Sequence, residues 1–143
     1  MSTEKSTPWH YWYVTGFCAL WVLFLVFGFI MTELEHPVFL SRFPPDLMNM
    51  LTAMPKWALA ARGVGICLGP VAIFLLVKRS RHSFWLFLMI LSALAVGTLG
   101  EQWMGLPATM KSTGIFASKW MNWGLLIGMV AYTHKMQEKG VLH

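Results

Sequence analysis

Residues 42–57 read RFPPDLMNMLTAMPKW, and residues 58–77 continue as ALAARGVGICLGPVAIFLLV. The second segment is apolar over about 20 residues, the length that a helix needs to cross the hydrocarbon core of a bilayer. Arg62 interrupts this segment five residues after Trp57. Placing a guanidinium at that depth in lipid costs free energy unless it has a partner or water. Residues 42–77 therefore predict a membrane span that contains one charged residue, Arg62, in need of a partner or water.

The rest of the chain repeats this apolar character. Of its 143 residues, 57% are hydrophobic and only 12% are charged, which leaves too few polar side chains to cover a soluble globule. Four apolar runs cover about residues 11–32, 57–77, 83–104 and 115–134. The sequence therefore predicts an all-α membrane fold, a bundle of four transmembrane helices that forms a single domain over residues 1–143. The first run is too long for a signal peptide, so we expect it to be retained.

Basic residues predict the orientation. Lys78, Arg79 and Arg81 crowd the short turn between the second and third runs, and the positive-inside rule places such a turn in the cytoplasm. Both termini then face the cytoplasm (N-in/C-in), and the loops at about 33–56 and 105–114 face the other side of a bacterial inner membrane. The net charge of +5 is thus mainly a topology signal, and no basic patch of the kind that binds nucleic acid is present.

The first outer loop carries its own helix signal. Pro45 and Asp46 can open a short helix over about residues 45–54, several of its side chains are apolar, and Pro55 ends it. We expect this helix to lie in the membrane interface or to cap the bundle. Packing explains such a pattern, and a lid over Arg62 is the functional alternative.

Tryptophans mark the ends of the runs. An interfacial aromatic belt requires amphipathic rings at these positions, and the predicted anchors are Trp9, Trp12, Trp57, Trp103 and Trp120. In a second interpretation, the tryptophans on the outer side, Trp57, Trp103 and Trp120, line a pocket or hold a pigment or quinone ring.

Small residues predict how the helices pack. Lipid provides little hydrophobic drive between helices, so close approach depends on rows of small side chains. Each of the last three runs has one such row, and the residues that we expect in helix contacts are Gly65, Gly69, Ala93, Gly97, Gly124 and Gly128. The same spacing is also typical of a face between two copies of a chain.

Depth along the helices links the charged residues. Arg62 lies roughly 7.5 Å inward from Trp57, and Glu101 lies about 4.5 Å inward from the outer end of the third run. We therefore predict that Arg62 and Glu101 form a pair or share a polar cavity. The alternative partners of Arg62 are Gln102, Glu33 and Glu35. In the competing interpretation, Arg62 extends to the outer headgroups and makes no specific contact.

Catalytic and metal-binding signals are weak. Cys18 and Cys67 show no metal-ligand spacing, and no hydrolase, kinase or dinucleotide-binding motif is found. His10 and His134 could form a haem or metal pair near the cytoplasmic boundary, but haem ligands usually lie deeper and interfacial roles fit better. We expect no catalytic site, no metal and no tightly bound cofactor, and lipid and quinone are the ligand classes left open.

Several short motifs occur in a recognisable order. They are Pro8-Trp9-His10-Tyr11-Trp12, Phe43-Pro44-Pro45, Pro55-x-Trp57-Ala58, Ala61-x-Gly63-x-Gly65 and Lys78-Arg79-Ser80-Arg81. This order resembles a group of small bacterial four-helix membrane proteins that are often labelled sugar transporters, and it is loosely similar to DoxX-like proteins. The resemblance covers roughly residues 8–103. It implies a four-helix inner-membrane protein and carries over no catalytic residue.

Three classes of function remain open. The first is an accessory or structural subunit that packs against a larger membrane complex or against itself, which small size and small-residue faces favour. The second is an oligomeric transporter of a small, sugar-like solute. The third is a DoxX-like, quinone-linked redox component, which rests on analogy of fold alone.

Overall fold

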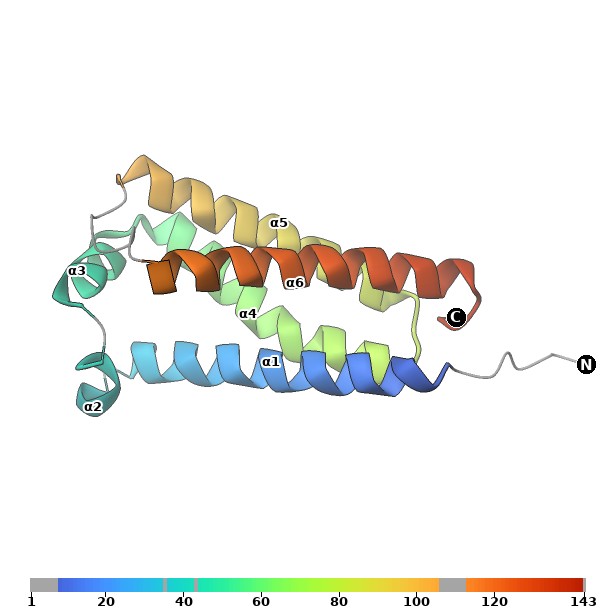
Figure 1. Ribbon diagram of the computed structural model, residues 1–143. Helices are drawn as coiled ribbons and strands as arrows, with labels where there is room; N and C mark the ends of the chain where they lie inside the picture. The colour runs from blue at the N-terminus through green and yellow to red at the C-terminus, as the bar shows by residue number, and fades with distance from the viewer. Residues whose placement is uncertain (1–7, 35, 43, 106–112, 143) are drawn as a thin grey trace, which may run out of the picture.

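A computed structural model describes residues 8–34, 36–42, 44–105 and 113–142, and all its regular structure over these residues is helical (Figure 1). The long helices are α1 (Trp9–Glu33), α4 (Lys56–Val77), α5 (His82–Trp103) and α6 (Thr113–Glu138). Two short helices, α2 (Pro37–Leu40) and α3 (Pro45–Ala53), connect α1 to α4. The predicted all-α class is confirmed, and a helix lies within a few residues of each predicted range, whereas α2 was not predicted. The single transmembrane domain and the interfacial position of α3 stay predictions.

Three of the long helices, α1, α4 and α5, are long and apolar enough to cross a membrane. α6 has 26 residues but is not among them, because Lys119, Asn122 and Lys135 interrupt its apolar side chains. The prediction of four spans is therefore supported for three helices. A fourth span through α6 stays a prediction.

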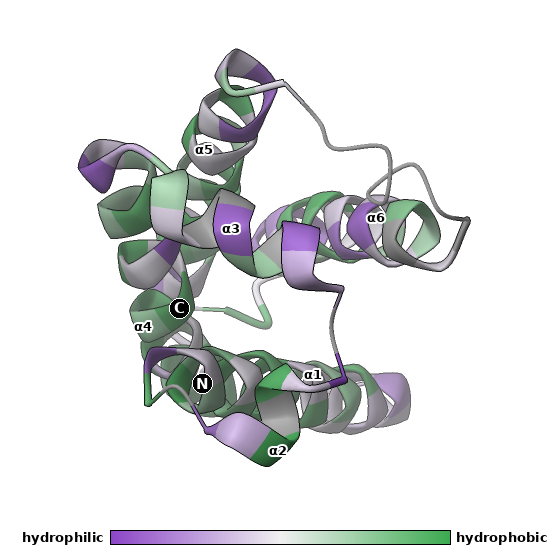
Figure 2. Ribbon diagram, turned by 90° about the vertical axis from the view of Figure 1, so that its left-hand side faces the viewer, coloured by the Kyte–Doolittle hydropathy of each residue, from purple (hydrophilic) through white to green (hydrophobic). Residues whose placement is uncertain are grey.

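The four long helices run up and down beside one another. The start of α1, the end of α6 and the basic turn between α4 and α5 lie at one end of the bundle, and α2 and α3 lie at the other (Figure 1). We call these the terminal end and the α3 end. Viewed along the bundle, the order around it is α1, α4, α5 and α6 (Figure 2). This arrangement is the one that the predicted topology requires, although the side of a membrane that each end faces stays a prediction.

Most of the buried core lies toward the terminal end. Its members come from all four long helices and the C-terminal segment: Tyr11, Cys18, Ala72, Leu76, Phe87, Ile90, Met129, Met136, Val141 and Leu142. Gly140 has a φ of +70°, which glycine adopts without steric cost, and the N–H of Val141 donates to the carbonyl of Met136 over 3.0 Å. This turn folds the last residues back onto the core and closes the terminal end.

The closest helix packing occurs between α4 and α5. A Cβ added to Gly100 would lie 2.5 Å from the Cβ of Ala58, and one added to Gly65 would lie 3.3 Å from the Cβ of Ala93. On the side toward α1, a Cβ on Gly69 would come within 2.9 Å of a methyl group of Val22. The small residues of α4 are therefore needed for close contact with both of its neighbours.

One buried hydrogen bond adds to the contact between α1 and α4. The hydroxyl of Tyr11 donates to the carbonyl of Leu76 over 2.5 Å. Leu76 lies in the last turn of α4, and its carbonyl also accepts the backbone N–H of Arg79 over 2.9 Å. Tyr11 thus adds a second hydrogen bond to this carbonyl and links the start of α1 to the end of α4.

Candidate functional site

An ion pair between α5 and α6 lies toward the α3 end. Nζ of Lys119 donates to Oε2 of Glu101, and the two side chains are 30% and 17% exposed. The α3 end therefore contains a half-buried charge pair, in contrast to the apolar core at the terminal end.

The predicted pair between Arg62 and Glu101 is not formed. Gly100 faces Ala58 of α4 at very short distance, and the next residue of a helix points about 100° further round its axis. Glu101 is consequently turned away from α4, and it meets Lys119 of α6 instead. Arg62 is exposed and makes no ion pair with any residue that the structure describes.

The alternative partners for Arg62 do not replace Glu101. Glu33 and Gln102 are both exposed, and within the described part of the chain neither is bonded to Arg62. Glu35 lies outside the described residues. Arg62 itself lies on the same stripe of α4 as the buried Ala58, Gly65 and Gly69, but no neighbouring helix covers it.

A second polar contact connects α1 to α6 near the middle of both helices. Nε1–H of Trp21 donates to Oδ1 of Asn122 over 3.3 Å. This contact was not predicted from the sequence. An asparagine inside an apolar run is nevertheless a signal for such a contact, because its amide needs a partner in lipid.

An apolar groove of about 420 Å³ runs between α1 and α6. Its lining residues are Tyr13, Val14, Phe17, Cys18, Trp21, Gly124, Leu125, Gly128, Met129 and Tyr132. Gly124 and Gly128 are exposed, and a Cβ added to either would have nothing within 4 Å. The part of the chain that the structure describes therefore leaves these two glycines uncovered.

The six residues predicted to lie in helix contacts thus divide into two groups. Gly65, Gly69 and Ala93 touch neighbouring helices, whereas Gly97, Gly124 and Gly128 have open space where a side chain would be. The sequence spacing alone does not distinguish these groups.

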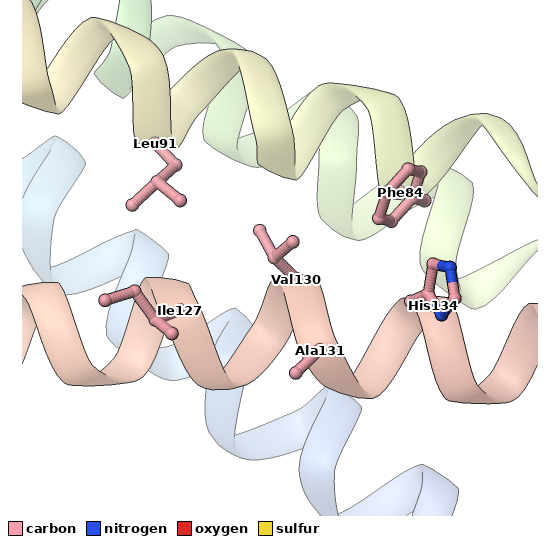
Figure 3. A pocket seen from close by; sticks show the side chains of 6 residues that line it. All are labelled: Phe84, Leu91, Ile127, Val130, Ala131 and His134. Carbon is pink, nitrogen blue, oxygen red and sulfur yellow. The ribbon is translucent and has the colours of Figure 1, made fainter.

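A second hollow of about 440 Å³ lies between α5 and α6 (Figure 3). Phe84 and Leu91 line it from α5, and Ile127, Val130, Ala131 and His134 line it from α6. His134 packs edge-on against Phe84 with ring centroids 5.5 Å apart, whereas His10 packs against Tyr132. Both histidines thus take part in aromatic packing, and the described residues include no group of three His, Cys, Asp or Glu that could hold a metal ion.

The predicted tryptophan anchors are all exposed at the two ends of the bundle. Trp9 and Trp12 lie at the start of α1, and Trp57, Trp103 and Trp120 lie toward the α3 end. None of these five rings lines either hollow. Their placement suits an interfacial belt, and the pigment-pocket interpretation gains no support from the two hollows.

Comparison with known proteins adds no further assignment. No family model, no curated protein and no solved structure matches the chain. The resemblance to small bacterial four-helix membrane proteins stays a prediction, and the functional argument rests on the geometry given above.

Proposed function

We propose that this protein is a small accessory membrane subunit that packs against another membrane helix through α6. The observation that carries the proposal is the uncovered face formed by Gly124, Gly128 and Ala131, all of which are exposed. Small residues at this spacing allow two helix backbones to approach closely in lipid. The glycines of the matching motif in α4 already pack against helices of the same chain, whereas a Cβ added to Gly124 or Gly128 would meet no described atom within 4 Å.

The groove beside this face supports the same role. It is lined almost entirely by apolar and aromatic groups of α1 and α6, so a helix lying across it would bury apolar surface on both sides. The occupant is either a helix of a larger membrane complex or a helix of a second copy of this chain.

In this proposal α6 is the fourth span of an N-in/C-in protein of a bacterial inner membrane. Polar groups raise the cost of placing a helix in lipid, and that cost falls when each group has a partner. Lys119 is paired with Glu101, and Asn122 accepts a hydrogen bond from Trp21. α6 therefore enters the membrane as part of the bundle, with its main polar groups already engaged.

Affinity capture from native membranes tests the proposal, with Gly128→Leu as the interface variant. Gly16→Leu is the matched control, because Gly16 is also an exposed helical glycine with nothing within 4 Å of an added Cβ. We expect wild type and Gly16→Leu to bring down a partner in fixed ratio, or to cross-link as oligomers. Gly128→Leu should lose that association and still be inserted at the wild-type level.

Equal association by the two variants would exclude the α6 face as the contact. A wild-type chain that is monomeric in native membranes and captures no stoichiometric partner would contradict the accessory role as a whole.

Transport of a small solute is a second candidate, and Asn122 is the observation that favours it. An amide near the middle of a membrane helix is unusual unless it serves packing or a polar path. Solute uptake into proteoliposomes distinguishes the two: uptake that Asn122→Leu abolishes supports transport, and the absence of uptake by a correctly inserted chain contradicts it.

A further inference from the structure

Arg62 is a positively charged side chain for which the bundle supplies no counter-charge. It is exposed in the second turn of α4, a helix long and apolar enough to cross a membrane. Glu101, the carboxylate that the sequence brings nearest in depth, is already bonded to Lys119. Among the described residues no acid forms an ion pair with Arg62, so this part of the chain leaves the guanidinium open to an external anion.

The N-terminus of α4 adds to the positive electrostatic potential near Arg62. Its first turn contains no acidic residue, and Pro55 at the N-cap position provides no side-chain hydrogen bond. The free amides and dipole of a helix N-terminus favour an anion nearby, and Lys56 adds a further positive charge.

The position of Arg62 along α4, just below the expected headgroup level, indicates which kind of anion it can reach. Its Cα lies roughly 7.5 Å inward from that of Trp57, at 1.5 Å of rise per residue. Trp57 and Trp103 are exposed at this end, as rings at the headgroup level would be. An arginine side chain is long enough to keep its stem in hydrocarbon and bring its guanidinium up to the phosphates.

We propose that Arg62 binds the phosphodiester group of a membrane phospholipid with net negative charge, in the leaflet at the α3 end. A guanidinium donates two parallel hydrogen bonds to phosphate oxygens, which favours arginine over lysine at such a site. This site is separate from the α6 face and goes beyond the packing role.

Native mass spectrometry of the delipidated full chain, titrated with dioleoylphosphatidylglycerol or dioleoylphosphatidylcholine, tests this inference. We expect wild type to bind one phosphatidylglycerol in preference to phosphatidylcholine. Arg62→Gln should weaken phosphatidylglycerol binding by at least about tenfold, the scale of a charged hydrogen bond, and Arg62→Lys should bind with intermediate affinity. Because Arg62 is exposed, neither variant should alter the helical content measured by circular dichroism.

Arg42→Gln is the matched control, since Arg42 is also an exposed arginine at the α3 end but lies outside the helices. It should bind phosphatidylglycerol as wild type does. The inference is wrong if Arg42→Gln and Arg62→Gln lose affinity equally, or if wild type binds both lipids alike. It is also wrong if millimolar inorganic phosphate displaces the lipid, because the site would then be one for a free anion.

Discussion

Two Gly-x-x-x-Gly motifs of this chain are used in opposite ways. In α4, Gly65 faces Ala93 and Gly69 faces Val22, at distances that leave no room for a larger side chain. In α6, Gly124 and Gly128 border an open groove, and a Cβ added to either would have no described atom within 4 Å. The same motif therefore builds the bundle in one helix and is left exposed in another.

The comparison extends to how the helices are held. Small residues of α4 pack closely against both of its neighbours. α6 contributes Met129 and Met136 to the core and adds side-chain polar contacts, through Lys119 to α5 and through Asn122 to α1. In lipid, both mechanisms replace the hydrophobic drive that operates in water. The small residues of α4 pack within the chain and need no partner chain. The open glycine face of α6 leaves room for a helix of a partner chain.

Overpacking the contact between α4 and α5 should have the largest effect. A side chain at Gly100 would collide with Ala58, so Gly100→Val should lower the free energy of unfolding by about 3 kcal/mol or prevent folding. Reversible unfolding in mixed micelles measures this. Gly97→Val on the same helix is the control, because a Cβ there has nothing within 4 Å. Equal losses at both positions would show that the α4–α5 contact is not as close as described.

Breaking the ion pair between α5 and α6 should come next. Glu101→Gln leaves Lys119 half-buried without a carboxylate, and we expect a loss of about 2 kcal/mol in unfolding free energy. A double-mutant cycle with Lys119→Gln should give a coupling energy above about 1 kcal/mol. A coupling near zero would mean that this pair does not hold α6.

The hydrogen bond between α1 and α6 should have the smallest effect. Trp21→Phe removes the N–H that Asn122 accepts but keeps an aromatic ring, and such bonds within membranes average about 0.6 kcal/mol. Trp103→Phe, at an indole that is 87% exposed, should leave stability unchanged in the same unfolding measurement. A loss above about 2 kcal/mol for Trp21→Phe would give the α1–α6 contact a larger structural role than its open groove indicates.

The sequence was sufficient to predict the four long helices and α3 to within a few residues, but not α2. Runs of apolar residues between prolines and basic turns define α1, α4 and α5, and the predicted outer-loop helix is found as α3. The sequence was insufficient for the rotation of each helix about its axis. A helix that is apolar on all sides has no polar face to show which side meets its neighbours, so the outward face of Gly124 and Gly128 could not be foreseen.

The candidate site shows the same limitation. Depth alone paired Glu101 with Arg62, because both lie a few ångströms inside the same end. The partner of Glu101 in the structure is Lys119 of α6. The decisive fact is that Gly100 faces α4, which turns Glu101 toward α6, and this became visible only in the packed bundle.

The central claim is that the glycines of α4 pack inside the chain and those of α6 do not. Thermal unfolding of the isolated monomer, compared for Gly65→Leu and Gly128→Leu, tests it most directly. We predict that Gly65→Leu loses more than about 2 kcal/mol through collision with Ala93. Gly128→Leu should match wild type or gain up to about 1 kcal/mol from helix propensity. Comparable losses in both variants, or a greater loss in Gly128→Leu, would contradict the account.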